Sequence, residues 1–393
     1  MKFSVLLPTR NRQEYLRYAI ESVLQQDYQN WEIIISDNDS EQDIKGYIAS
    51  LADPRIKYFR TSTFVPVTDN WNNALEKNTG DYIIMLGDDD CLAKGYFRTT
   101  SKLLEQHHYP EMIYNSALVY AYPGIFPEHP EGLLLKWGNA SFLEGRKEPF
   151  YLDKSEAHIA VRQVLNFRNE FNYNIQFSLF SKEFIKKMQC YGPFFQSPYP
   201  DYYATTASLL KAERILAVPF PLVAIGITPK SFGGFYFSGN EKEGVKFLNN
   251  TSESEVSRRM KKHLIPGNSM ISSWLLAMET VRTNFGKEFD LKVSYNKYRF
   301  LQVLDHYYKF ALKKGVNTKD LMNLSRYLFW WEKAVYSTPL YLLSLCVRIL
   351  PTKRKEGWCA QLIQSISHPQ FSTKRIEGKF SNILEAVENV NLP

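Results

Sequence analysis

The chain has 393 residues, a mass of 45.8 kDa and a formal net charge of +7. Its length favours two or three domains of about 150 residues each, and 44% hydrophobic with 23% charged residues excludes a disordered tail. The four cysteines form no Cys-x-x-Cys pair, which argues against a disulfide scaffold or a cysteine zinc site and favours a reducing compartment. The N-terminus carries one lysine before Pro8 and is expected to form a buried strand, not a signal peptide.

The positive charge is concentrated in the second part of the chain. Residues 1–250 hold 26 lysines and arginines against 29 acids, whereas residues 251–393 hold 22 against 12. Aromatic residues make up 15% of the chain. A basic, aromatic-rich C-terminal part is compatible with contact with nucleic acid, with an anionic membrane surface or with solvent alone, and composition does not decide among them.

The first hundred residues alternate short apolar runs with helical periodicity, which is typical of a mostly parallel sheet with crossover helices. Strands are expected at 3–7, 31–36, 56–59 and 82–86, and helices at 15–24, after Ser40 and at 70–77. The predicted fold class is therefore α/β, with a Rossmann-like, mostly parallel sheet flanked by helices.

The remainder of the chain is less regular, and then helical. Helices are expected at 96–106, 156–167 and 201–211 and a strand at 112–114, whereas Pro219 and Pro221 favour an edge strand or extended segment at 216–227. Beyond residue 250 the periodicity predicts helices at 256–264, 272–285, 298–313 and 318–333. We therefore expect an α/β domain at 1–235 and a basic, mainly helical region at 236–393.

The longest apolar stretch, residues 339–347, is about half of the ~20 residues that a membrane-spanning helix needs. Two interpretations stay open. One is a buried helix of the C-terminal region; the other is a helix in the membrane interface, with the basic residues 353–355 at anionic headgroups. The C-terminal helices are also candidates for homo-oligomer contacts. The protein is expected to be cytoplasmic, with peripheral contact with the inner face of the cell membrane.

Three adjacent carboxylates, Asp88, Asp89 and Asp90, follow the fourth expected strand directly. Ligands of parallel α/β sheets bind beyond the carboxyl ends of the strands. Adjacent carboxylates raise one another's pKa unless a cation lies among them, and Mn²⁺ or Mg²⁺ bound together with a substrate phosphate would relieve the repulsion. The alternative is a solvated acidic turn, which is less expected directly after a buried strand.

Polar segments also follow the first and second expected strands. Residues 8–12 (Pro-Thr-Arg-Asn-Arg) place amides and cations where a diphosphate can lie beside a helix N-terminus. Residues 36–40 (Ser-Asp-Asn-Asp-Ser) can bind a base or ribose, or form only a turn and a helix cap. With the acidic triplet, these segments place polar groups on one edge of one sheet.

Residues 3–12, 34–40 and 80–90 together resemble family 2 glycosyltransferases of the GT-A fold. The resemblance is strong over residues 1–115, extends to about 235 and is absent beyond. It implies transfer of a sugar from a nucleotide-diphosphate donor, expected to be a UDP-sugar, to an acceptor hydroxyl with inversion at the anomeric carbon, with Mn²⁺ or Mg²⁺ as cofactor. It also implies bacterial surface polysaccharide synthesis, on a carbohydrate or lipid-linked saccharide acceptor.

The resemblance also assigns roles to residues. Pro8 and Thr9 would border the base, and Asp37 and Asn38 would hold the base and ribose. Among the three acids, Asp89 is the preferred candidate for binding the metal. The full donor-binding set is Pro8, Thr9, Arg10, Asn11, Arg12, Asp37, Asn38, Asp39, Asn72, Asp88 and Lys230. The metal set is Asp89, Asp88 and Asp90. Family members often have an aspartate where this chain has Gly87.

An inverting transfer needs a base that takes the acceptor proton. Asp201 lies about 110 residues after the acidic triplet at the expected start of a helix, where the family places its catalytic acid. The alternative is that Asp201 only caps this helix. Lys230, close to the pair Gly233-Gly234, is a candidate for a loop that closes over the phosphates.

Two other functions are weaker alternatives. A nucleotidyltransferase acting on sugar phosphates would use a similar sheet, but the chain lacks the glycine-rich, lysine-bearing first loop that grips a triphosphate. A basic nucleic-acid-binding protein is remote because no compact basic and aromatic motif is present, so no nucleic acid partner is expected. No G-x-G-x-x-G follows the first strand, which argues against a dinucleotide cofactor.

Overall fold

The computed structural model describes residues 1–126, 129–231, 235, 244, 246, 255–349 and 373–388. Contacts divide the chain into two units. Unit 1 comprises Met1–Ile159, Phe171–Ser252 and Phe371–Pro393, and unit 2 comprises Ala160–Glu170 and Glu253–Gln370. The sequence predicts a single boundary at residue 235. The structure differs because the C-terminal residues from Phe371 belong to unit 1.

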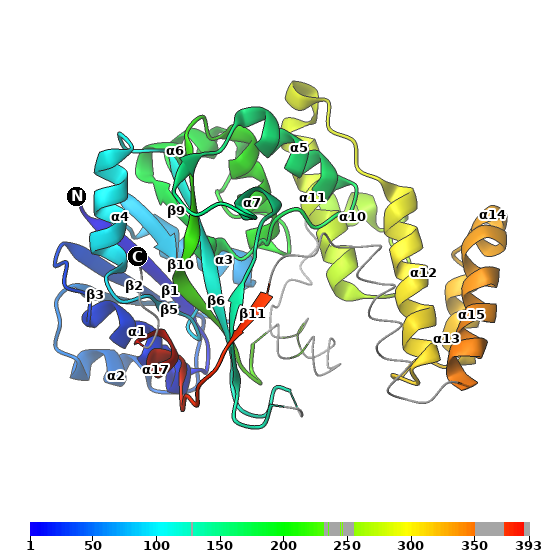
Figure 1. Cartoon of the computed structure of the whole chain (residues 1–393), viewed down its shortest axis with the longest axis horizontal. Coiled ribbons are helices and arrows are strands. Elements are labelled where there is room, and N and C mark those ends of the chain that lie inside the picture. Colours follow the sequence, from blue (N-terminus) through cyan, green and yellow to red (C-terminus); the bar gives the residue numbers. More distant parts are fainter. Residues whose placement is uncertain are drawn as a thin grey trace. The chain divides into compact units, whose positions relative to one another are not determined.

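Unit 1 is built on a parallel sheet with the strand order β3-β2-β1-β4. The strands are β1 (Phe3–Thr9), β2 (Trp31–Asp37), β3 (Ile56–Arg60) and β4 (Tyr82–Met85). All residues of β1, β2 and β4 are buried, which explains their nearly continuous apolar sequences. The crossover helices α1 (Gln13–Leu24), α2 (Ile44–Ser50) and α3 (Val67–Glu76) connect them (Figure 1). The predicted α/β class with a mostly parallel sheet is confirmed.

The sheet continues beyond β4 with strands of both directions. β9 (Ser178–Ser181) lies antiparallel between β4 and β6 (Met112–Ala121), which in turn pairs with β7 (Leu133–Trp137). β10 (Ile215–Ile227) pairs in parallel with β6 and, on its other side, with the two-residue strands β5 (Cys91–Leu92) and β8 (Phe150–Tyr151).

The prediction of an edge strand at 216–227 is wrong because β10 has neighbours on both sides. Its prolines are accommodated by register shifts between Val218 and Pro221 and between Pro221 and Val223. Proline lacks the N–H of a ladder hydrogen bond, so an irregularity of this kind is what permits prolines in an interior strand. The remaining helices of this part are α4 (Tyr96–Gln106), η1 (Ser141–Leu143), α5 (Lys154–Leu165), η2 (Ile175–Phe177), α6 (Lys182–Met188), η3 (Gln189–Tyr191) and α7 (Pro200–Lys211).

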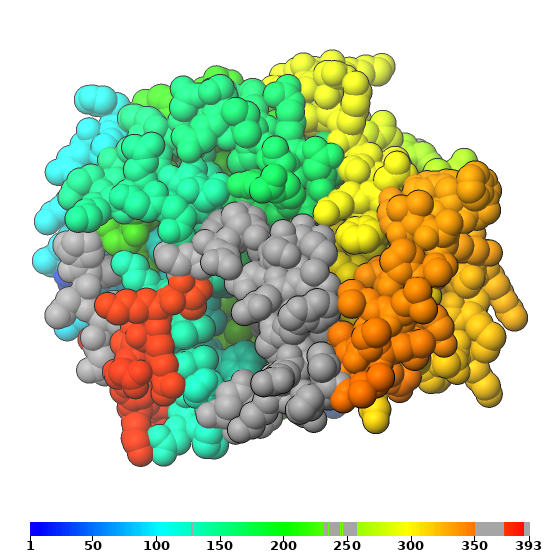
Figure 2. Space-filling model, turned by 45° about the vertical axis from the view of Figure 1, so that its right-hand side comes forward, coloured from blue at the N-terminus to red at the C-terminus, as the bar shows by residue number. Residues whose placement is uncertain are grey.

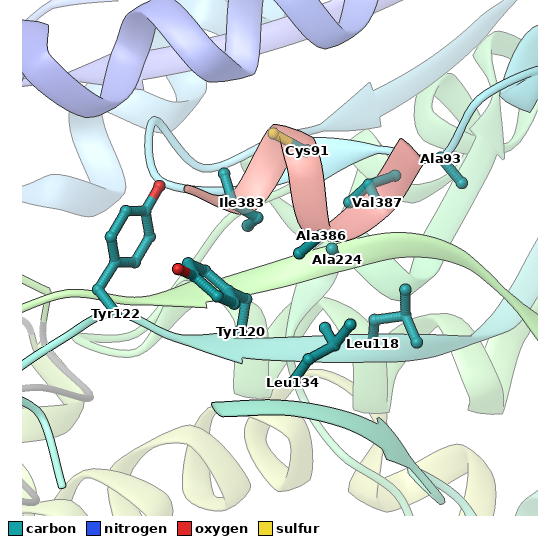
Figure 3. Packing of buried hydrophobic residues seen from close by; sticks show 10 residues of the cluster. All are labelled: Cys91, Ala93, Leu118, Tyr120, Tyr122, Leu134, Ala224, Ile383, Ala386 and Val387. Carbon is teal, nitrogen blue, oxygen red and sulfur yellow. The ribbon is translucent and has the colours of Figure 1, made fainter. Parts of the chain in front are cut away.

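The C-terminal segment returns to the sheet of unit 1. Strand β11 (Thr373–Ile376) pairs antiparallel with β7, at one end of the strand order (Figure 1). Helix α17 (Ile383–Glu388) then buries Ile383, Ala386 and Val387 in an apolar cluster with residues of β5, β6 and β10 (Figure 3). The Tyr120 hydroxyl donates a hydrogen bond to the Phe380 carbonyl at 2.7 Å. These two residues, in segments that form one core, are 260 positions apart in the chain.

Unit 2 is helical in its described residues. It contains α10 (Glu255–Met260), α11 (Ser269–Phe289), α12 (Tyr295–Ala311), α13 (Thr318–Ser325), α14 (Trp330–Glu332), the π-helical turn η4 (Lys333–Ser337) and α15 (Thr338–Ile349). The single helix predicted at 318–333 is therefore interrupted after Ser325. Arg299 of α12 forms a buried ion pair with Glu332 of α14, at 2.5 Å, and this pair attaches the segment after the interruption to α12. Within the described ranges, no helix has the length and apolar character needed to cross a bilayer.

Candidate active site

The acidic triplet at the end of β4 faces a buried arginine from the loop after β1. Arg12 Nη1 lies 2.6 Å from Asp88 Oδ1, and Arg12 Nη2 forms a second ion pair with Asp89 Oδ2. All three side chains are almost completely buried. Burial lowers the pKa of Arg12, but the neighbouring Asp88 and Asp89 more than compensate and raise it, so the guanidinium stays charged. Arg12 thus supplies charge relief that the sequence assigned to a divalent cation alone.

Hydroxyl groups complete this ionic centre. The Thr9 hydroxyl donates to Asp88 Oδ2 at 2.7 Å. Thr228, which follows β10, accepts from Arg12 at 3.0 Å and donates to Asp89 Oδ2 at 3.3 Å. Burial, opposed by Arg12 and aided by the Asp89 charge, raises the pKa of Asp88 to about 6. Thr228 has no counterpart among the residues predicted from the sequence.

Asp90 has a different environment from its two neighbours. Its Oδ1 accepts from the Gly226 amide at 2.8 Å and its Oδ2 accepts from the Gly87 amide at 3.0 Å. Both glycines are required by close approach: a Cβ atom at Gly87 would lie 2.4 Å from Asp90 Oδ2, and one at Gly226 would lie 1.9 Å from the Asp89 carbonyl oxygen. The glycine that departs from the family pattern at position 87 therefore makes room for the Asp90 carboxylate.

These contacts bear on whether the triplet fits a divalent cation. Both oxygens of Asp88 and both oxygens of Asp90 have partners, whereas the contacts of Asp89 involve Oδ2. Across the described residues, no group of three or more His, Cys, Asp or Glu side chains is arranged to hold a metal. Mg²⁺ requires only one or two carboxylates when substrate phosphates supply other ligands. The site therefore fits a cation shared by Asp89 and a phosphate, and it does not fit a cage of three carboxylates.

The loop after β2 contributes a fixed carboxylate and a fixed amide. Asp37 is fully buried, and it accepts hydrogen bonds from the Tyr58 hydroxyl at 2.6 Å and the Ser40 amide at 2.9 Å. Burial and the Asp37 charge raise the pKa of Tyr58 to about 12. Asn38 accepts from the Val65 amide at 2.9 Å and donates to the Val65 carbonyl at 2.8 Å, so its side chain is bound to the segment after β3.

The loops after β1 and β2 are joined to each other. The Asn11 amide donates to the Ser40 hydroxyl at 2.9 Å, and the Asn11 side chain accepts from the Glu41 amide at 2.7 Å. Asn11 and Asp39 both have positive φ values, 54° and 56°, which are uncommon for residues other than glycine. Asp39 also accepts from Arg60 at 2.8 Å. Asn11 and Asp39 therefore shape the loops through contacts within the protein.

Two further predicted residues, Pro8 and Arg10, lie at the end of β1 and directly after it. Pro8 lies opposite Ser36 in the β1–β2 register, one position before Thr9. The Arg10 guanidinium lies 3.8 Å from the centre of the Phe64 ring, in cation–π geometry. Nε of Arg10 is buried without a hydrogen-bond partner. Phe64, like Tyr58 and Arg60, lies in a segment to which the sequence assigned no binding role.

Asn72 is hydrogen-bonded to the segment before α7. Its side chain donates to the Phe195 carbonyl at 2.9 Å and accepts from the Phe195 amide at 3.2 Å. Thr68 of the same helix donates to the Ser197 carbonyl at 2.8 Å. These bonds attach the segment that leads into α7 to helix α3, so Asn72 has a positioning role in the structure.

Asp201 occupies the first turn of α7, as the sequence predicted. Burial raises the pKa of Asp201 to about 7, although it accepts a hydrogen bond from the Tyr202 amide at 2.9 Å. The helix also contacts η2, whose own neighbours include β4. Lys230 differs from the buried residues of the site. Its side chain is half-exposed and forms an ion pair with Glu14 at 2.8 Å. The glycines 233 and 234 beside it lie outside the described residues.

The comparison with protein families concerns the same part of the chain. Residues 4–126 match the model described as "Glycosyl transferase family 2". The GalNAc(5)-diNAcBac-PP-undecaprenol beta-1,3-glucosyltransferase of Campylobacter jejuni is 41% identical over 101 residues, which are 25% of this chain and 33% of that protein. An Escherichia coli protein, UDP-Glc:alpha-D-GlcNAc-diphosphoundecaprenol beta-1,3-glucosyltransferase WfgD, is 31% identical over 87 residues, which are 22% of this chain and 34% of that protein.

The chain thus spans about a third of the length of these two relatives. Among solved structures, S. aureus TarS 1–349 in complex with UDP-GlcNAc superposes with a TM-score of 0.46 at 15% identity, and covers 83% of this chain and 90% of that one. The matched residues 4–126 contain the loops after β1, β2 and β4 and therefore Thr9, Arg12, Asp37 and Asp89. The resemblance read from the sequence motifs is confirmed to this extent: residues 4–126 match the family model described as "Glycosyl transferase family 2".

Proposed function

We propose that the protein transfers a sugar from a nucleotide-diphosphate donor, expected to be a UDP-sugar, to an acceptor hydroxyl with inversion at the anomeric carbon. The observation that carries this proposal is the convergence of Thr9, Arg12, Asp88 and Asp89 at the edge of the sheet, in a chain whose residues 4–126 match this family model. Asp37 and the loop that Asn38 binds would hold the base and ribose. Arg10 lies on the same edge, beside Phe64.

The chemistry needs a base and stabilisation of the leaving diphosphate. The acceptor oxygen forms a bond to the anomeric carbon while the bond from that carbon to the diphosphate oxygen breaks, and the acceptor proton passes to Asp201. A carboxylate with a pKa near 7 is suited to this because it is partly ionised at neutral pH and binds a proton readily. Asp201 stands in the first turn of α7, which contacts η2, and η2 in turn contacts β4.

A divalent cation, Mn²⁺ or Mg²⁺, would be held by Asp89 together with the donor phosphates, and Arg12 would keep Asp88 and Asp89 in place. When bound, such an ion neutralises charge on the leaving diphosphate as a Lewis acid. Asp88 would have a positioning role through its bonds to Arg12 and Thr9. Asp90 would have one through the hydrogen bonds that it accepts from the Gly87 and Gly226 amides.

The test is a screen of nucleotide sugars with Mn²⁺ or Mg²⁺, read as release of nucleoside diphosphate, followed by the anomeric configuration of the product by NMR. We expect release from one class of donor and a product of opposite configuration. Retention would contradict the inverting mechanism. Release of pyrophosphate from a nucleoside triphosphate and a sugar phosphate would instead favour a nucleotidyltransferase and overturn the proposal.

We also propose that unit 2 contacts an anionic membrane, where an acceptor like the undecaprenol-linked substrates named for the two relatives would be found. Most of the large exposed hydrophobic residues in the described ranges lie between residues 322 and 349. We call them the apolar surface of unit 2: Met322, Tyr327, Phe329, Trp330, Val335, Tyr341, Leu342, Leu345 and Ile349. Figure 2 shows this segment, in orange, at the surface.

The charges of this segment suit anionic lipid. Arg326, Lys333 and Arg348 accompany the apolar surface, and the one acid between residues 321 and 349, Glu332, is buried in its ion pair with Arg299. Trp330, two residues before that buried acid, is 80% exposed. Exposed aromatic and aliphatic side chains with nearby cations are typical of helices that lie in a membrane interface. The basic residues 353–355, to which the sequence assigned the same role, lie outside the described residues.

Sedimentation of the full chain with vesicles tests this contact without any donor or acceptor. We expect binding to phosphatidylglycerol-containing vesicles but not to phosphatidylcholine alone, and a loss of about 10-fold or more in partitioning for Trp330→Ser with Ile349→Ser. Ile159→Ser removes an exposed isoleucine outside the apolar surface and should bind like wild type. Absence of vesicle binding at low salt would overturn the membrane contact. It would also be overturned if the double variant loses a homo-oligomer of the protein and its lipid binding is unchanged.

A further inference from the structure

Gln176 lies in the short helix η2 (Ile175–Phe177), near the loop that starts the acidic triplet. Helix η2 contacts both β4 and α7. A Cβ atom at Gly87 would lie 3.3 Å from Gln176 Nε2, which places the amide beside the loop that starts the triplet. The side chain is 8% exposed. Gln176 was not singled out from the sequence because it belongs to no motif.

The Gln176 side chain forms no hydrogen bond with another described residue, although its amide can donate two hydrogen bonds and accept two. Its backbone position is well fixed, since Ile175 and Phe177 on either side are fully buried. The Tyr173 ring, three residues earlier, stacks on Tyr202 of α7 at 4.0 Å, and Thr205 donates to the Tyr173 carbonyl at 3.1 Å. Neither Gln176 Oε1 nor Gln176 Nε2 is among the completely buried polar atoms without a partner, so the amide of this mostly buried side chain is open to solvent and to a ligand. A mostly buried amide that is held in place and has both donors and acceptors available is suited to a polar ligand.

The proposed reaction identifies which part of the substrate reaches this position. The anomeric carbon must lie between the diphosphate, on the side of Asp89, and the base Asp201. The transferred sugar must therefore occupy the space between the end of β4 and the start of α7, and η2 contacts both of these elements. Sugar hydroxyls both donate and accept, which matches the amide.

We propose that Gln176 binds a hydroxyl of the transferred sugar and thereby contributes to the choice of donor. This inference rests on the proposed glycosyl transfer and adds a specificity-determining residue to it. Because the amide contacts the sugar and not the nucleotide, its removal should affect the sugar donor while leaving nucleoside diphosphate binding intact.

The experiment compares wild type with Gln176→Leu, which has a similar volume and no polar group. Donors are UDP-glucose, its C4 epimer UDP-galactose and UDP-N-acetylglucosamine, with UDP as the ligand that lacks the sugar. For the donor that wild type prefers, kcat/KM should fall about 10- to 100-fold and the ratio between the epimers should shift, as expected when one buried hydrogen bond to substrate is lost. The Kd for UDP should stay within about 2-fold. Gln25→Leu, an exposed glutamine of the α1 C-terminus, serves as the matched control and should behave like wild type.

Three outcomes are decisive. Unchanged kcat/KM and donor ratio in Gln176→Leu, with an active wild type, would overturn the role of Gln176 alone. An equal loss of UDP affinity, sugar-donor affinity and Tm would also overturn it, because it would indicate a structural role. A wild type that releases nucleotide from no donor would overturn the proposed glycosyl transfer, and the role of Gln176 with it.

Discussion

The Arg12 guanidinium lies 2.6 Å from Asp88 Oδ1, within an ion pair whose side chains are almost fully buried. The same guanidinium reaches Asp89, so one cation from the loop after β1 serves two carboxylates from the loop after β4. A buried charge without a partner is strongly destabilising, whereas each of these three has one. The pairing therefore couples the integrity of the site to the stability of unit 1.

Replacement of Arg12 should reveal this coupling. Arg12→Met leaves Asp88 and Asp89 buried without their cation and should lower the free energy of unfolding by about 3–5 kcal/mol. Urea denaturation followed by circular dichroism measures the change. Arg17→Met removes an exposed arginine of α1 and should cost less than about 0.5 kcal/mol. A loss below about 1 kcal/mol for Arg12→Met would contradict the importance of the pair.

Asp89→Asn should abolish cation-dependent turnover while the protein stays folded. The substitution keeps the size of the side chain and removes the charge that would share a cation with the donor phosphates. We expect a fall in kcat/KM of at least about 100-fold, since such an ion contributes several kcal/mol to the transition state. Calorimetric titration with Mn²⁺ in the presence of UDP should show weakened binding.

The control for Asp89→Asn is Asp27→Asn, which removes an exposed carboxylate paired with Arg98. Asp90→Asn should differ from both: it disturbs the bonds to the Gly87 and Gly226 amides, so it should lower the Tm. Full activity in both Asp89→Asn and Asp88→Asn would refute the assignment of the cation to this loop.

The pH dependence of turnover should reflect Asp201. Its carboxylate acts as the base only when ionised, so kcat/KM should rise with pH and reach half its maximum near the pKa of Asp201, at about pH 7. Asp201→Asn should remove this dependence and most of the turnover while the Kd for the donor persists. Unchanged turnover in Asp201→Asn would leave the residue only as part of the α7 N-terminus.

The same carboxylate should make stability depend on pH. Burial raises its pKa from 3.8 to about 7 in the folded state, so the folded state binds the proton more tightly than the unfolded state. The free energy of unfolding should therefore fall as pH rises from about 4 to 7, and Asp201→Asn should be more stable than wild type at pH 8 by roughly 2–4 kcal/mol. Thermal unfolding of both proteins at pH 5 and pH 8 checks the sign, and an equal Tm difference at both pH values would contradict it.

Glu32 should have the opposite effect. Burial alone would raise its pKa, but hydrogen bonds from Lys2, Lys57, Ser4 and the Thr79 amide lower it from 4.5 to about 2. The resulting stability is present above the unfolded pKa and is lost as pH falls from about 4.5 to 2, with a total of about 3 kcal/mol. Glu32→Gln should be less stable than wild type at pH 6 and nearly equal to it at pH 2, measured by urea denaturation. A difference that does not depend on pH would contradict the role of the charge.

Much of the site was accessible from the sequence because its residues follow buried strands directly. Thr9, Asp37 and Asp89 lie where the apolar runs of β1, β2 and β4 end, and parallel pairing brings those ends to one edge. Other contributors were not accessible because no local pattern marks them. Thr228 meets Asp89 from the end of a strand whose prolines predicted an edge, and Gln176 comes from a three-residue helix.

The net charge of +7 illustrates the same division. The sequence by itself determined that acids gather after β4 and that cations gather in the C-terminal part, because charge and apolar periodicity are local properties of a chain. Only the tertiary structure decided which groups the acids of the triplet meet: Arg12 pairs with Asp88, and backbone amides donate to Asp90. It also decided that the last strand and helix belong to the first unit. Those outcomes depend on which distant segments pack together, since the partner of a buried charge is chosen by burial and geometry and not by its neighbours in the chain.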